Sequence, residues 1–280
     1  MNNFKKTLIS CLILLNVTTL ALAEYPQNTT NPNFNFLASR NTGDFHFDGL
    51  TNVTGNSNAV FFIDPAWTHS NNWKAGGRSE ELNLGAGIRL WTPNFFYEGA
   101  VVGANVYYDR QWTVNDNTYN QLGIGMEFLS EYFDARVNGF IPFSRKEGVA
   151  GKTRQTYFNT TAIHSVLNGS NEYAFWGYNA ELGIRLPFSE DYGVTRVYLG
   201  YDDFNARGIS NRDSLKLKAT YNPVQFIQFA FQYYFDRDLL DTHWLFGANF
   251  NIPLDWSEFS LIRNKTTLPV NRLHERVFRY

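Results

Sequence analysis

Cysteine is nearly absent from this chain, and long apolar segments are absent after its first 23 residues. The one cysteine among the 280 residues is Cys11. Beyond residue 23, no apolar run approaches the ~20 residues that a membrane-spanning helix needs. The remainder of the chain therefore forms no disulfide, and neither a disulfide-stapled domain nor a helical membrane protein is expected.

An excess of positive charge is also missing. The chain has 24 Lys and Arg residues against 26 Asp and Glu residues, a formal net charge of −2. Residues 1–23 carry two lysines and no acid, so without them 22 basic residues face 26 acidic ones, a net charge of about −4. This balance provides no basic surface for a nucleic acid, and no nucleic-acid partner is expected.

The first 23 residues have the layout of a secretory signal peptide. Lys5 and Lys6 precede the apolar residues 8–17, and residues 21–23 (ALA) fit a cleavage site of the small-x-small kind. A lipoprotein signal is the alternative, because residues 8–11 (LISC) resemble a lipobox, but the apolar run continues beyond them. We expect residues 1–23 to be removed on export, and we interpret the polar residues 24–32 as a periplasmic lead-in.

Strict alternation of apolar and polar residues is what the chain has instead, together with an aromatic content of 17%. Between Val102 and Ile141, for example, Leu122, Ile124, Met126 and Phe128 alternate with Gln121, Gly123, Gly125 and Glu127. A period of two predicts β-strands that have one apolar face. The pattern marks twelve candidate strands between residues 33 and 255, of which three near the beginning are weak and one of those contains Pro65.

The lengths of the links between these strands separate a membrane barrel from a soluble sandwich. Short links at residues 91–95, 130–132 and 222–224, with a slightly longer one at residues 187–193, fall on one side. The polar links at residues 68–80, 110–118, 144–171, 202–210 and 236–241 fall on the other side and are mostly longer. Two links among the weak strands, residues 39–43 and 51–58, do not follow this rule. Outer-membrane barrels have tight periplasmic turns and longer outer loops. The sequence therefore predicts an all-β protein, a twelve-stranded antiparallel transmembrane β-barrel of the bacterial outer membrane.

Charged residues in the strands lie on the less apolar face. A Lys or Arg facing lipid near the membrane midplane would cost ~2 to 4 kcal/mol, so this face is expected to line the lumen. The predicted lumen-lining charges are Arg89, Asp109, Glu127, Asp134, Arg136, Glu181, Arg185, Arg196, Lys216 and Lys218. Their mixed signs on neighbouring strands predict ion pairs that hold the shape of the barrel, rather than an ion-selective or catalytic group.

Catalytic and metal-binding patterns are missing. The five histidines are scattered, and the chain has no HxxxH or CxxC spacing. Twelve-stranded outer-membrane phospholipases use His and Ser, but the adjacent His69 and Ser70 would point to opposite faces of a strand and could not act together. We therefore expect no enzymatic activity, no metal and no cofactor.

Two features follow at the C-terminal end. Gly247, Phe250 and Ile252 match the glycine, aromatic and apolar positions of the signal by which the outer-membrane assembly machinery recognises barrels, although Leu245 replaces the polar residue usual at its start. Residues 256–280 form a basic tail. The tail either plugs the lumen or lies as a mobile segment in the periplasm. The candidate plug residues are its arginines, Arg263, Arg272, Arg276 and Arg279.

Five blocks of the sequence resemble the β-domain of the intimin/invasin family, the inverse autotransporters. They are residues 84–89 (LGAGIR), 103–109 (GANVYYD), 121–127 (QLGIGME), 136–142 (RVNGFIP) and 181–187 (ELGIRLP), which occur in the family's order and with similar spacing. The resemblance covers about residues 45–280. It implies a twelve-stranded barrel with both ends in the periplasm that anchors a C-terminal passenger, displayed outside as an adhesin.

The chain departs from this family in one respect. Residues 272–279 resemble the segment that follows the barrel, but the sequence stops at Tyr280 without an immunoglobulin-like or lectin passenger. We therefore expect a monomeric translocator or anchor barrel over residues 33–255, with a linker or tail over residues 256–280. Its expected partners are the lipid bilayer, the assembly machinery and a host-cell surface or a separate passenger. A small-solute diffusion pore and an adhesin acting through its outer loops, above all residues 144–171, are the alternatives.

Overall fold

A computed structural model describes most of the chain after residue 29. The described residues are 30–38, 42–72, 77–95, 99–143, 147–149, 163, 165–168, 171–187, 193–206, 212–224, 226–236, 243–251, 272–273 and 275–279. The expected signal peptide, Ile252 and Arg263 lie outside these residues.

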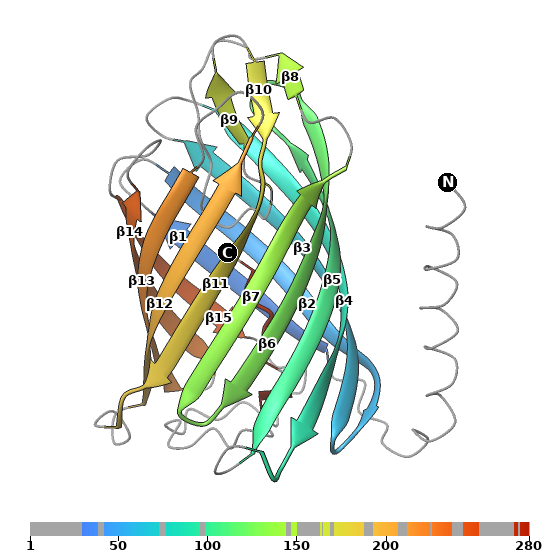
Figure 1. The fold of residues 1–280 in the computed structure, drawn as a ribbon, viewed down its shortest axis with the longest axis vertical. Coiled ribbons are helices and arrows are strands. Elements are labelled where there is room, and N and C mark those ends of the chain that lie inside the picture. The colour runs from blue at the N-terminus through green and yellow to red at the C-terminus, as the bar shows by residue number, and fades with distance from the viewer. Residues whose placement is uncertain are drawn as a thin grey trace.

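Twelve antiparallel strands form one closed barrel, which confirms the predicted fold class (Figure 1). They are β1 (Thr30–Ala38), β2 (Thr42–Asn56), β3 (Ala59–Asn72), β4 (Arg78–Thr92), β5 (Ala100–Trp112), β6 (Thr118–Ser130), β7 (Phe133–Pro142), β11 (Trp176–Arg185), β12 (Val194–Asn205), β13 (Arg212–Val224), β14 (Ile227–Asp236) and β15 (His243–Asn251). Each strand pairs with its neighbours in this order, and β1 closes the ring against β15, with Asn33 opposite Asn251.

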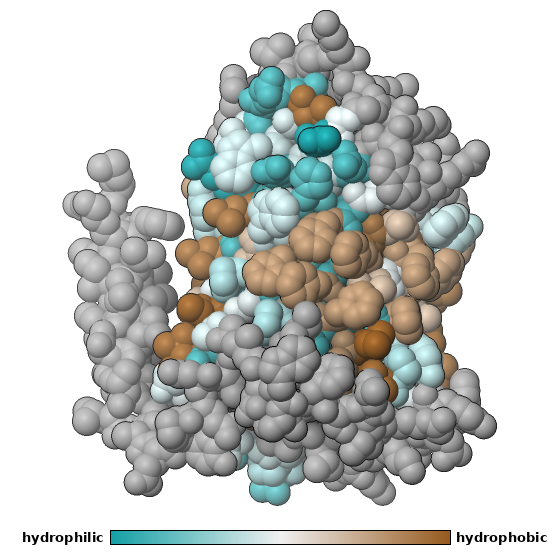
Figure 2. All heavy atoms as spheres, turned by 180° about the vertical axis from the view of Figure 1, so that it is seen from behind, coloured by the Kyte–Doolittle hydropathy of each residue, from teal (hydrophilic) through white to brown (hydrophobic). Residues whose placement is uncertain are grey.

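The alternation in the sequence becomes an apolar exterior and a polar interior. In β6, Met126 is 62% exposed whereas its neighbour Glu127 is 5% exposed. Figure 2 shows a hydrophobic band around the middle of one side of the barrel, with hydrophilic residues above it. This distribution inverts that of a soluble sandwich and is the one that lipid outside and polar groups inside require. Within the described residues, no helix is long and apolar enough to cross a membrane.

The two ends of the barrel differ in their connections. We call one end the turn end, where residues 57–58, 93–99, 131–132, 186–193 and 225–226 link successive strands, and the other the loop end. The expected link at residues 51–58 is in fact two residues long, because β2 continues to Asn56. That link is therefore short, as the rule requires at this end. The exceptions are residues 39–41, a short link at the loop end, and residues 93–99 and 186–193, which are longer links at the turn end.

Three short strands stand beyond the loop end (Figure 1). They are β8 (Glu147–Val149), β9 (Ser165–Asn168) and β10 (Asn171–Ala174), and they form a separate sheet in the order β8-β10-β9. The longest predicted loop, residues 144–171, thus contains regular structure.

Pro65 lies within β3 without weakening it. It stands opposite Leu84 of β4, where the pairing runs without a break. On its other side, the pairing of β3 with β2 is interrupted between Ala66 and Ile63. A proline has no backbone N–H to donate and is tolerated where the ladder is interrupted. The sequence-based view of this strand as weak was therefore wrong.

Candidate functional site

The lumen of the barrel holds the C-terminal part of the chain. We call the described residues 272, 273 and 275–279 the lumen segment. Arg272, Leu273, Arg276, Val277 and Arg279 are all buried against inward-facing side chains of the strands. Figure 1 shows the C-terminal end of the chain within the ring of strands. The candidate site is therefore the surface of the lumen that receives this segment.

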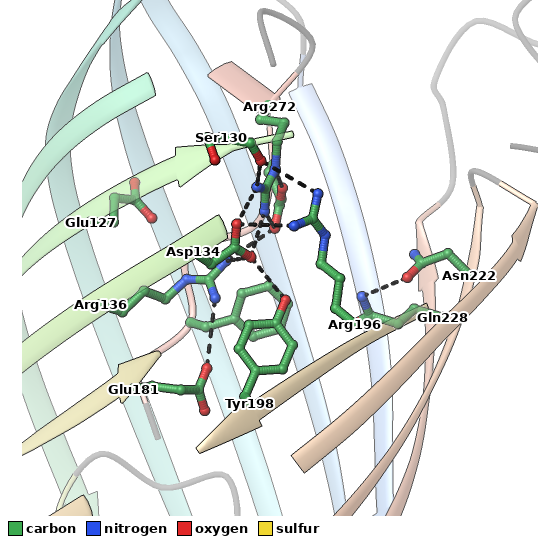
Figure 3. Close-up of polar contacts among 12 residues, drawn as sticks. Glu127, Ser130, Asp134, Arg136, Glu181, Arg196, Tyr198, Asn222, Gln228 and Arg272 are labelled. Atoms are coloured by element: carbon green, nitrogen blue, oxygen red, sulfur yellow. Dashed lines mark hydrogen bonds and ion pairs between the residues drawn. The ribbon is translucent and has the colours of Figure 1, made fainter. Parts of the chain in front are cut away.

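Arg272 binds the wall near the turn end. Its guanidinium donates to both carboxylate oxygens of Asp134, the second residue of β7, at 3.0 Å to Oδ2 and at a short distance to Oδ1 (Figure 3). The same guanidinium donates to the Ser130 carbonyl oxygen at 2.7 Å and to the Glu275 carboxylate at 2.6 Å. A paired, fork-shaped contact of this kind fixes direction as well as position.

Asp134 is the centre of a larger charged cluster (Figure 3). Arg196 of β12 donates to its Oδ1 at 3.2 Å, and the Tyr198 hydroxyl donates to its Oδ2 at 2.9 Å. Arg136 lies 3.7 Å from Oδ2 and 3.2 Å from the Glu275 carboxylate. A buried carboxylate is costly unless it is paired and hydrogen-bonded, and here three guanidiniums and a hydroxyl surround it.

Arg276 binds a second aspartate, at the middle of β2. Its Nε lies 2.6 Å from the Oδ2 of Asp48. The same Oδ2 lies 3.1 Å from the Nε2 of His46, whose other ring nitrogen is 2.7 Å from the Thr68 hydroxyl. Arg276 thus joins a polar group that extends along the inner faces of β2 and β3.

Arg279 binds a third aspartate, nearer the loop end. It donates from Nη1 and Nη2 to the two carboxylate oxygens of Asp109 in β5, at 2.8 and 2.7 Å. Its guanidinium carbon lies 3.7 Å from the centre of the Tyr107 ring, as in a cation–π contact. A Cβ on Gly123 would lie 2.1 Å from Nη2, so the absence of a side chain there makes room for Arg279.

The backbone of the lumen segment is bound as well. Arg89 of β4 donates to the carbonyl oxygen of Leu273 at 3.1 Å and to that of Glu275. Asn138 donates to the Phe278 carbonyl oxygen at 3.4 Å, and Asn179 donates to that of Arg279 at 3.2 Å. These contacts supply hydrogen-bond donors to four backbone carbonyl oxygens of the lumen segment.

Two apolar contacts complete the binding surface. Leu273 packs in a buried cluster with Val60, Val101 and Leu129. Val277 packs with Leu50, Phe62 and Tyr107. The lumen surface therefore offers the segment both charged and apolar partners.

All ten predicted lumen-lining charges are buried on the inner side of the barrel. The pairs they form, with their N···O distances, are Arg89–Glu127 at 2.5 Å, Arg136–Glu181 at 3.6 Å, Lys216–Glu181 at 3.3 Å, Lys218–Glu181 at 2.5 Å, Arg185–Glu131 at 2.7 Å and Arg196–Asp134 at 3.2 Å, with Asp109 bound to Arg279. Arg136 and Arg196 gather around Asp134, and Glu181 is the centre of a second group with the two lysines.

Sequence reasoning missed acidic residues that contribute to the site, among them Glu131, which pairs with Arg185, and two residues within strands. Asp48 lies in β2, which was a weak candidate, but Asp44, His46 and Asp48 alternate there with two phenylalanines. Glu81 lies in β4, one alternation step before Asn83 on the same inner face. The alternation was therefore the signal that could have identified both.

Two of the remaining predicted residues lie in β15. Gly247 stands opposite Leu37 of β1, and Phe250 is 37% exposed on the outer side. Ile252, the third residue of the proposed assembly signal, and Arg263, the first candidate plug residue, lie outside the described part of the chain. Within the described part, no group of three or more His, Cys, Asp or Glu residues could hold a metal ion.

Comparisons with known proteins agree with the barrel fold. The family model described as "Inverse autotransporter, beta-domain" matches residues 25–259. Intimin of Escherichia coli O157:H7 is 28% identical over 154 residues, which are 54% of this chain and 14% of that protein. Intimin of Escherichia coli O111:H- is also 28% identical, over 56% of this chain and 16% of that protein. The chain thus spans a small fraction of the length of these relatives.

One solved structure reproduces most of the fold. A chain from a study headed "Unveiling the Mechanism Behind the in-meso Crystallization of Membrane Proteins" has a TM-score of 0.63 and 18% identity. The match covers 90% of the present chain and 96% of the other. At this identity, the likeness shows the fold alone.

Proposed function

The chain belongs to the inverse autotransporter β-domain family, and we propose that its outer-membrane translocator barrel anchors a surface-displayed passenger that adheres to host cells. The observation that carries this proposal is the lumen segment. Three arginines bind three aspartates on three different strands, at Asp48, Asp109 and Asp134. A barrel that grips a polypeptide in this way is suited to hold a chain across the membrane.

The direction of the lumen segment supports display at the surface. Arg272 contacts the beginning of β7 at the turn end, whereas Arg279 contacts Asp109, the tenth residue of β5, closer to the loop end. We assign the turn end to the periplasm, because outer-membrane barrels have short periplasmic turns and longer outer loops. Three of the five links at the turn end are two residues long, and the longest connection between barrel strands, residues 143–175, lies at the other end. A polypeptide that continues beyond this segment is therefore directed towards the cell exterior.

The same contacts argue against a free diffusion pore. A bound polypeptide with buried arginine pairs occupies the lumen, whereas porins keep a water-filled channel. Small solutes would have to pass the lumen segment.

A second candidate function is adhesion through the outer loops. It is supported by the ordered sheet of β8, β10 and β9 beyond the loop end. Glu172 anchors this sheet to the barrel, because its carboxylate accepts from Thr113 at 2.8 Å and from Asn117 at 2.6 Å. A loop that is held in one shape offers a defined surface to a receptor.

Assembly in the membrane is a further part of the proposal. Gly247 and Phe250 lie in β15, which closes the barrel against β1, and we assign them to the signal that the assembly machinery reads. The apolar outer face is the partner of the lipid bilayer.

A display assay tests the proposal. A small folded reporter is fused after Tyr280, and its accessibility to antibody and protease is measured on intact cells. We expect it to be accessible, and we expect less of it in a variant with asparagine at Asp48, Asp109 and Asp134. Accessibility only after the outer membrane is permeabilised would overturn the proposal.

The adhesive part has its own test. Cells that carry the barrel with its passenger are compared with cells that carry the barrel alone, for adhesion to cultured host cells. A barrel that adheres equally well alone, and loses adhesion when residues 147–174 are replaced by a short linker, would favour the loop candidate. No adhesion in any form would leave an anchor without an adhesive role.

A further inference from the structure

A second element contacts the inner wall of the barrel at the loop end. We call Ile163, together with β9 and β10, the lid. Ile163 is completely buried and packs against Tyr119 of β6 and Ala174 of β10. Its N–H donates to the Oε2 of Glu81 at 3.0 Å, and its carbonyl oxygen accepts from the Gln111 side chain at 3.1 Å. The backbone of the lid is thus bound by the inner wall of the barrel.

Hydrogen bonds connect this lid contact to the lumen segment without a gap. Glu81 accepts through Oε1 from the Asn83 side chain at 2.7 Å. The same Asn83 amide donates to Asp109 at 2.8 Å, and Asp109 binds Arg279 at 2.7 and 2.8 Å. A side-chain amide nitrogen carries two hydrogens, one for each carboxylate. We call this series of hydrogen bonds the relay; it runs from Arg279 through Asp109, Asn83 and Glu81 to the Ile163 N–H.

The relay depends on charge. Glu81 and Asp109 are both completely buried, and the Asn83 amide is the only group between them in the relay. Arg279 brings a positive charge to this pair of carboxylates. Removing one partner of a buried ion pair leaves an uncompensated charge, which is strongly unfavourable. Without Arg279, we expect Asp109 to take up water or a new donor, so that Asn83 and Glu81 no longer hold their positions.

We propose that the lumen segment controls the contact between the lid and the inner wall: Ile163 is held there when Arg279 binds Asp109, and it is released when Arg279 leaves, while Glu172 still anchors β10. A polypeptide that passes through the lumen before Arg279 arrives would do so while Ile163 is not held against the inner wall, and the arrival of Arg279 would fix Ile163 there. The coupling between Arg279 and Ile163 requires no passenger. A negative result for this coupling would therefore not contradict the proposed display function, and a negative result in the display assay would not contradict the coupling.

Thiol labelling of the lid tests the coupling. In an Ile163→Cys variant, the rate of reaction with a water-soluble maleimide is measured on the folded barrel in detergent and is read at position 163 by mass spectrometry. We expect slow labelling when Ile163→Cys is the only substitution. Adding Arg279→Gln should accelerate labelling roughly tenfold, within the range usual for coupling between two sites.

Two further variants separate the relay from general loosening. Gly123→Ala keeps every residue of the relay but would place a Cβ 2.1 Å from Arg279 Nη2, so it should also accelerate labelling. Arg276→Gln removes an equally buried arginine that binds Asp48, outside the relay, and should have a much smaller effect. Equal acceleration by Arg276→Gln would overturn the proposed route, and no acceleration by Arg279→Gln or Gly123→Ala would overturn the coupling.

Hydrogen exchange gives a measurement without a substitution in the lid. The exchange rate of a peptide that contains Ile163 is compared between the parent chain and Arg279→Gln, after gel mobility without boiling has shown that both are folded. We expect exchange to be roughly tenfold faster in the variant, because the amide loses Glu81 as its acceptor. Unchanged exchange would contradict the proposal even if the cysteine variant failed to fold.

Discussion

Arg89 of β4 and Glu127 of β6 form an ion pair at 2.5 Å across the strand that lies between them. The pair passes over Gly103 of β5, which stands opposite both Arg89 and Glu127 in the strand pairing. A Cβ on Gly103 would lie 2.6 Å from the Glu127 carboxylate. The missing side chain on the middle strand is thus what allows residues two strands apart to meet.

Loss of the carboxylate should destabilise the barrel. In Glu127→Gln, Arg89 remains buried without its charged partner, and we expect a loss of about 3 to 5 kcal/mol in the free energy of unfolding. Urea titration of the barrel in lipid vesicles measures this loss. The matched control is Glu80→Gln, at an exposed carboxylate 3.5 Å from His69, where the change should stay below about 1 kcal/mol. Equal losses in the two variants would contradict a structural role for the buried pair.

A side chain on the middle strand should disturb the same pair sterically. Gly103→Ala is expected to cost about 1 to 3 kcal/mol, because Glu127 must move from its place. Gly139→Ala is the comparison within β7, since its Cβ would meet Ile124 at an ordinary 3.4 Å. The temperature at which the folded barrel loses its gel mobility ranks the two variants. This explanation would be refuted if the Gly139→Ala barrel lost its folded gel mobility at a lower temperature than the Gly103→Ala barrel.

Removal of the tail should open the lumen. Deletion of residues 256–280 takes away the lumen segment and its three arginine pairs, so we expect a clear rise in single-channel conductance in planar bilayers. A chain that carries the same tail residues in scrambled order is the control for tail length. It should conduct more than the parent, because its arginines no longer face the three aspartates. Equal conductance of the deletion variant and the parent would remove the idea of a plug.

The outer sheet should depend on Glu172. In Glu172→Ala, the Thr113 hydroxyl and the Asn117 amide lose a buried acceptor, at a cost of about 1 to 3 kcal/mol for each unsatisfied group. We expect limited proteolysis to cut residues 147–174 faster, with the barrel strands intact. Asp116→Asn, at an exposed position of the same link with a positive φ of 59°, should leave the cutting rate unchanged because asparagine tolerates this conformation. Equal rates in Glu172→Ala and the parent would show that the sheet does not depend on this anchor.

Much of the fold could be predicted because a barrel obeys a simple local rule. Because each strand has lipid on one side and polar groups on the other, apolar and polar residues alternate along it. The positions of Met126 and Glu127 in this alternation are enough to predict that Met126 faces outward and Glu127 faces inward. Where the rule was obscured, the prediction failed. Pro65 made β3 look weak, because a sequence does not show that the neighbouring ladder is interrupted at that point.

The sequence by itself determined the strands, the inward face of each charge and the basic character of the tail. Only the tertiary structure decided which charges meet. Asp48, Asp109 and Asp134 lie far apart along the chain, and they come to one lumen only when β1 pairs with β15 and the ring closes. The choice between a periplasmic tail and a lumen segment depends on this convergence, because burying three arginines is favourable only where three carboxylates already face inward.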